Sequence, residues 1–152
     1  MLRSFAILLL AIVFIPGIAC AEAWRQETNL YRRVERGMET AFLEMEQARK
    51  IYREGNPYKS QEHLETSIDT ALAAYHEIVE SGEDMRKRSR QFKKVEIQLR
   101  AIHRNLEDFE KQVEMVDRGP VERARQTISK MQDNLLNSMF QGGVLPSIEK
   151  VK

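Results

Sequence analysis

The chain has very little cysteine. Cys20 is the single cysteine among 152 residues, so no disulfide can form within one chain. The Cys-x-x-Cys-His motif that attaches c-type haem is absent for the same reason. If the chain is cleaved after Ala21, the mature protein has no cysteine at all, and its stability depends on noncovalent packing alone.

An excess of one charge sign is also missing. Residues 1–21 contain Arg3 and no acid, so the rest of the chain has equal numbers of basic and acidic residues. Nucleic acids attract proteins with an excess of basic residues, often with aromatic side chains interleaved among them. Because this chain has neither feature, we expect no nucleic-acid partner.

Motifs for catalysis and metal binding are absent too. None of His63, His76 and His103 has a Glu three positions before it, as a di-iron carboxylate bundle requires. There is no His-Glu-x-x-His motif and no glycine-rich phosphate loop after a strand. We predict that the protein is not an enzyme, that it holds no metal or cofactor, and that its histidines lie partly buried on helix surfaces.

The first 21 residues are typical of a secretory signal. Arg3 supplies a positive charge, an unbroken apolar run follows from Phe5 to Ile15, and small residues come after the Pro16-Gly17 break. We therefore predict a signal peptide over residues 1–21. Its presence indicates export from a bacterial cell to the periplasm or the cell envelope.

Three fates of this segment remain open. Ordinary cleavage follows Ala21 or Ala23, because both positions fit the small-x-small rule. Alternatively, Cys20 is lipidated and becomes the first residue of a lipoprotein, although Gly17 stands where leucine is usual. In the third case the segment stays as an anchor, for which the uncharged stretch 4–21 is short.

Beyond residue 21 the apolar residues recur at alternating spacings of three and four positions, in four segments. This spacing places one apolar stripe on each helix. It is typical of helices that pack nearly parallel or antiparallel with a left-handed twist. The stripes are Val34, Met38, Ala41, Met45, Ala48 and Tyr52; Leu64, Ile68, Ala71, Tyr75 and Ile78; Phe92, Val95, Leu99, Ile102, Leu106, Phe109, Val113 and Val116; and Val121, Ala124, Ile128, Met131 and Leu135.

These stripes predict an all-α fold, an antiparallel four-helix bundle with left-handed heptad-like packing, after the signal peptide. We expect one bundle domain over residues 22–141 and a flexible C-terminal tail over 142–152. The break at Ser81-Gly82 is open, because Gly82 and Met85 also continue the stripe. The expected helices cover about residues 25–54, 57–81, 88–116 and 120–140.

A pair of repeat-type helical hairpins is the alternative packing. Ala48, Tyr52, Gly55 and Tyr58 have the spacing of the first helix and turn of a tetratricopeptide repeat. The small and aromatic residues expected further on are missing, and no second copy follows at a period of about 34 residues. We therefore favour the bundle.

A dense cluster of positive charge is the sharpest local feature, with six cations within nine residues. One interpretation is a docking patch for anionic lipid head groups, a cell-wall polymer or an acidic partner. The other is a solvated loop that is partly neutralised by Glu83, Asp84 and Glu96. The six cations are Arg86, Lys87, Arg88, Arg90, Lys93 and Lys94.

The second half of the chain contains a recognisable set of residues. They are Gly82, Arg86-Lys87, Phe92-Lys93-Lys94, Glu96-Ile97, Arg100, Arg104-x-Leu106-Glu107-x-Phe109, Pro120-Val121-Glu122-x2-Arg125, Leu135-Leu136 and Gly142-Gly143. With them, residues 82–143 resemble an uncharacterised family of exported bacterial helical proteins. The family pattern has a proline where this chain has Glu83-Asp84-Met85. The resemblance implies a helical fold and export, and it implies no activity, cofactor or catalytic residue.

Together these features predict an exported helical-bundle protein of the cell envelope that works by protein–protein contact or as a structural module. Its expected partner is another envelope protein or a second copy of itself. The alternative function is binding of an anionic lipid or polymer through the basic segment 86–94.

Overall fold

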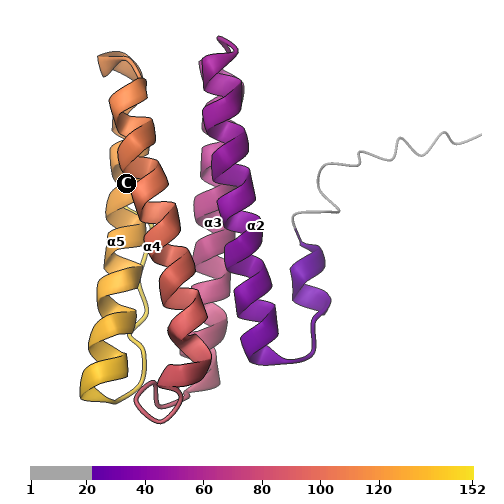
Figure 1. Cartoon of the computed structure of the whole chain (residues 1–152), viewed down its shortest axis with the longest axis vertical. Coiled ribbons are helices and arrows are strands. Elements are labelled where there is room, and N and C mark those ends of the chain that lie inside the picture. The colour runs from indigo at the N-terminus through magenta and orange to yellow at the C-terminus, as the bar shows by residue number, and fades with distance from the viewer. Residues whose placement is uncertain (1–21) are drawn as a thin grey trace, which may run out of the picture.

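The computed structural model describes residues 22–152. The predicted signal peptide, with the candidate lipidation site Cys20, lies outside the described residues. The helices stand side by side in one bundle, which confirms the predicted all-α helical bundle (Figure 1). None of the described helices combines the length and apolar character needed to cross a membrane. The elements are η1 (Ala23–Gln26), α2 (Leu30–Arg53), α3 (Pro57–Ser81), α4 (Ser89–Gln112), η2 (Met115–Asp117) and α5 (Arg118–Gln141).

Local signals in the sequence set the helix boundaries. α2 begins later than predicted because the side chain of Asn29 caps it, accepting a backbone N–H of the first turn. Asn56 caps α3 in the same way, with Pro57 at the first helical position. α3 ends at Gly82, whose φ of 63° lies in the left-handed region that favours glycine. Residues 82–88 therefore separate α3 from α4.

The connection between α4 and α5 differs from the prediction. α4 ends at Gln112 rather than near residue 116, η2 follows, and α5 begins at Arg118. Val113 still packs into the core, whereas Val116 is 82% exposed. The 3-4 spacing continues past the point where the helix stops, so Val116 is not the core residue that we predicted.

The other stripe residues form the core as predicted. All of them are buried except Val116 and Tyr52, which is half-buried. Each fully buried large apolar side chain contributes roughly 1.5–3 kcal/mol relative to an exposed one, so the four stripes supply most of the driving force for folding. Trp24, Met85 and Leu145 join this core from segments outside the four long helices.

Two helical hairpins, α2–α3 and α4–α5, make up the bundle, with α2 beside α4 and α3 beside α5 (Figure 1). α2 and α4 run in the same direction. Lys94 pairs with Glu35 at 3.0 Å near the start of both helices, and Arg49 donates to Asn105 at 2.6 Å further along. The short loop 82–88 favoured α3 and α4 as antiparallel neighbours. They are antiparallel, but they lie diagonally across the bundle.

Small residues allow α2 and α3 to approach closely. A Cβ atom on Gly37 would lie 2.8 Å from the Cβ of Ala74 and 3.1 Å from the ring of Trp24. The buried hydroxyl of Ser67 donates to the carbonyl oxygen of Ala41 at 2.6 Å. The polar group on this interface is thus satisfied by the backbone of the neighbouring helix.

The segment 142–152 is not the flexible tail that we predicted, since it packs between α3 and α5. The hydroxyl of Tyr75 on α3 donates to the carbonyl of Pro146 at 2.7 Å. On α5, the hydroxyl oxygen of Thr127 accepts the N–H of Val151 at 3.1 Å. Apolar side chains of the segment cover the groove between the two helices. If the segment were solvated instead, this part of the core would be exposed to water.

The buried phenol of Tyr75 gives a testable pH dependence. Burial raises the pKa of Tyr75 above its ordinary value, because the charged form is poorly solvated there. A raised pKa in the folded state contributes stability that is present below pH about 10 and is lost as the pH rises through the folded pKa. At pH 8 we expect Tyr75→Phe to be less stable than the wild type by about 1 kcal/mol, because the bond to Pro146 is lost.

Urea unfolding followed by circular dichroism, in steps from pH 8 to pH 11, measures this difference. We expect the advantage of the wild type over Tyr75→Phe to shrink above pH about 10. Comparing the two proteins at each pH cancels the titration of the other groups. A difference that stays constant up to pH 11 would contradict the assignment.

Candidate functional site

The six predicted docking cations lie together at one end of the bundle, in loop 82–88 and the first turns of α4, and all six are exposed. The chain after α5 reaches the same place. Asp84 and Val144 form an isolated bridge, and the N–H of Met85 donates to the carbonyl of Gly143 at 3.3 Å. We call residues 82–94 and 140–144 the basic end.

Half of the cations at the basic end are paired with acids. Exposed pairs of this kind contribute about 0–1 kcal/mol each and leave the charges accessible. Over residues 22–152, Arg86, Arg90 and Lys93 have no ion-pair partner. Three of the six cations are therefore neutralised by neighbouring acids, and docking through the segment stays a prediction. The pairs are Lys87 with Asp84 at 3.8 Å, Arg88 with Glu83 at 3.2 Å and Lys94 with Glu35 at 3.0 Å.

Glu96 does not neutralise the basic end, although the sequence favoured it for that role. Its carboxylate is buried and pairs with Arg100 one turn further along α4. Hydrogen bonding to Glu96 raises the pKa of Arg100 above its ordinary value. Arg100 supplies the counter-charge for the buried carboxylate of Glu96. The pair therefore acts within α4 and not on the cations of the basic end.

Two exposed apolar side chains flank the cations of the basic end. Phe140 is 78% exposed in the last turn of α5, and Val144 is 59% exposed beside Asp84. The sequence pattern does not predict either residue, because both lie outside the stripes. The signal that was available is the absence of any charged residue over 134–148 in a chain that is otherwise rich in charge.

The opposite end of the bundle exposes a second apolar feature. Met115 is 84% exposed and Val116 82% exposed, both within η2. The hydroxyl of Tyr52 holds η2 against α2. It donates to Asp117 at 3.0 Å and accepts the N–H of Glu114 at 2.9 Å. The two apolar side chains are therefore presented by a turn that is held in place.

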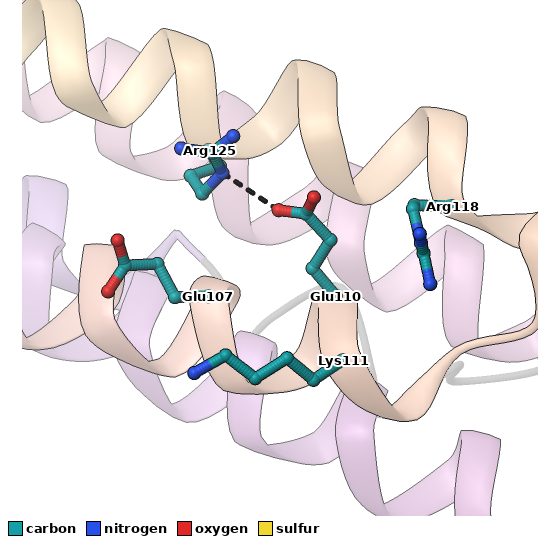
Figure 2. A pocket seen from close by; sticks show the side chains of 5 residues that line it. All are labelled: Glu107, Glu110, Lys111, Arg118 and Arg125. Atoms are coloured by element: carbon teal, nitrogen blue, oxygen red, sulfur yellow. Dashed lines mark hydrogen bonds and ion pairs between the residues drawn. The ribbon is translucent and has the colours of Figure 1, made fainter.

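A charged cavity of about 360 Å³ opens between α4 and α5 beside η2 (Figure 2). Glu107, Glu110 and Lys111 line it from α4, and Arg118 and Arg125 line it from α5. Glu110 accepts a hydrogen bond from Nε of Arg125 at 2.8 Å. Nε of Arg118 is buried and has no hydrogen-bond partner within residues 22–152.

A smaller cavity of about 80 Å³ is lined in part by η2, with Val116 in its wall. We call η2 and its two cavities the η2 end. The sequence pattern does not predict this surface, because the 3-4 spacing places Val116 in a buried stripe. The smaller cavity is lined by Tyr52, Pro57, Ser60, Gln61, Leu64, Phe109, Val113, Val116, Asp117, Pro120 and Val121.

The three histidines lie apart from one another and are half-buried on the helices. Nδ1 of His63 lies 2.6 Å from a carboxylate oxygen of Glu44, and Nε2 of His76 donates to the carbonyl of Ile148 at 3.0 Å. His103 stands on α4, away from both. In the part of the chain that the structure describes, no group of three or more His, Cys, Asp or Glu residues is placed to hold a metal ion.

The fold and these surfaces define the class of protein as an all-α helical bundle with an accessible feature at each end. No family model matches the chain, and no curated protein or solved structure is significantly similar to it. The resemblance of residues 82–143 to exported bacterial helical proteins stays a prediction.

Proposed function

We propose that this protein is a non-enzymatic interaction module of the bacterial cell envelope, exported by its N-terminal segment, and that its η2 end binds another envelope protein. The observation that carries the proposal is the exposure of Met115 and Val116, each above 80%, in a turn held by Tyr52. Contiguous exposed apolar surface is a common mark of interaction sites, and methionine is enriched at protein interfaces.

The surroundings of η2 favour a protein partner. The wall of the larger cavity, beside η2, carries both charge signs, with two acids and three bases. An apolar centre with a polar rim is the usual anatomy of a protein interface.

The hydrogen bonds of Tyr52 also lower the cost of binding. They hold η2 against α2 in the free protein, so less conformational freedom is lost when a partner covers the turn. A preformed surface of this kind suits a stable contact better than a flexible loop does.

Site-specific photo-cross-linking of the full chain in cells tests the proposal. With the photo-reactive amino acid at position 115, we expect one recurrent envelope protein to be cross-linked. With the probe at Leu43, which is 62% exposed in the middle of α2, we expect none. Val116→Asp should lower the yield from position 115 by about tenfold, because a charge then stands at the apolar centre.

Three outcomes would overturn this assignment. Equal labelling from positions 115 and 43 would mean that the contacts are nonspecific. An unchanged yield with Val116→Asp would place the interface elsewhere. Cross-links between two copies of this chain alone would make the module self-associating.

A further inference from the structure

We propose that the basic end docks on the surface of an anionic lipid bilayer. The cations would meet the lipid head groups, and Phe140 and Val144 would enter the boundary between head groups and acyl chains. The inference does not depend on the η2 end binding a protein, because it uses the opposite end of the bundle.

Charge complementarity is the first support. Residues 83–94 contain six bases and two acids. Glu35 on α2 adds one more carboxylate through its pair with Lys94. A clear positive excess therefore remains at this end of an otherwise balanced chain. Clusters of four to eight Lys and Arg are typical of segments that bind anionic lipid head groups.

The exposed apolar side chains decide between a bilayer and a soluble polyanion. A polymer in solution needs only the cations, and it offers no apolar layer for an aromatic ring. A bilayer offers both, and basic faces combined with exposed phenylalanine are typical of proteins that lie at the lipid interface. Phe140 is 78% exposed, so its apolar ring is available to enter that layer.

The cationic and apolar parts belong to one surface. A Cβ atom on Gly142 would lie 3.4 Å from Cδ of Arg86, and the N–H of Met85 donates to the carbonyl of Gly143. The chain that links Phe140 to Val144 thus runs directly beside the basic loop. When the protein docks through this end, the helix axes point away from the membrane surface, and the η2 end is the end far from the membrane (Figure 1).

Vesicle co-sedimentation with residues 22–152 tests the charge. This segment holds the core that the structure describes, from Trp24 to Leu145, and its helicity is checked first by circular dichroism. We expect it to bind phosphatidylcholine vesicles only when they contain phosphatidylglycerol. The test variant replaces the unpaired cations with Gln (Arg86→Gln, Arg90→Gln and Lys93→Gln). It should bind about 100-fold more weakly, at about fivefold per cation.

A matched control distinguishes an effect of the basic end from an effect of the net charge of the protein. Lys50→Gln, Arg53→Gln and Lys59→Gln remove three exposed cations at the other end of the bundle. This control has the same net charge as the test variant. We expect it to bind like the wild type, and a loss equal to that of the test variant would overturn the proposal.

A second pair of variants tests the apolar contact. Phe140→Ser should weaken binding by about tenfold. Tyr58→Ser, at a residue of 77% exposure on the opposite end, should leave binding unchanged. If Phe140→Ser binds like the wild type while the charge variant does not, the surface recognises soluble polyanions and the bilayer proposal fails. Equal binding to vesicles with and without phosphatidylglycerol would also overturn it.

Discussion

Replacing Leu145 with alanine is expected to lower the free energy of unfolding by about 2–3 kcal/mol. Leu145 is 2% exposed and belongs to the main core, although it lies beyond the last helix. The loss is set at the lower half of the range for buried leucines, because a chain segment near a terminus relaxes into part of the cavity. Urea unfolding followed by far-ultraviolet circular dichroism measures the difference.

The neighbouring residue provides the control. Val144 is 59% exposed, so Val144→Ala should change the free energy of unfolding by less than about 0.5 kcal/mol. The contrast between the two variants tests the packing of residues 142–152 directly. If Leu145→Ala proves as mild as Val144→Ala, the segment is the loose tail that the sequence predicted.

Substituting Gly37 with alanine is expected to destabilise the protein by about 1–3 kcal/mol, even though alanine is the better helix former. The added Cβ would lie 2.8 Å from the Cβ of Ala74, so α2 and α3 must move apart. Trp24 contacts the same point, at 3.1 Å from the added atom, and leaves little room for that shift. Thermal unfolding should show a lower midpoint.

Gly119 offers the same substitution without the clash. Apart from its own chain neighbours, its added Cβ would meet only the flexible end of Arg123, at 3.3 Å. We expect Gly119→Ala to leave the stability unchanged or to raise it by up to about 1 kcal/mol. If both alanine variants stabilise the protein, the close approach of α2 and α3 at Gly37 is not a constraint.

The two proposed surfaces give the length of the bundle a use as a spacer. α2 has 24 residues, and at about 1.5 Å per residue it spans about 36 Å. The basic end and the η2 end lie at opposite ends of this span. A module docked on lipid through the first would hold a partner of the second at about that distance from the membrane surface.

The candidate sites were predictable only in part. The six cations were found as a cluster because they are close in sequence, and a short loop keeps them together. Phe140 and Val144 lie about fifty positions further on. Their place at the same end as the basic loop depends on where α5 ends relative to that loop, with Gly142 against Arg86 and Val144 against Asp84. Val116 was hidden by a stripe that continues in sequence after the helix has stopped, and Met115 by the prediction that this helix extends to about residue 116.

The sequence by itself determined which segments become helices and which face of each is buried. The 3-4 spacing, the asparagine caps and Gly82 act within a few residues, so their effects can be deduced locally. Only the tertiary structure decided which helices are neighbours, that α3 and α4 lie across the diagonal, and that residues 142–152 fill the groove between α3 and α5. Those outcomes depend on how apolar faces from distant segments fit together, and the spacing within one segment does not contain that information.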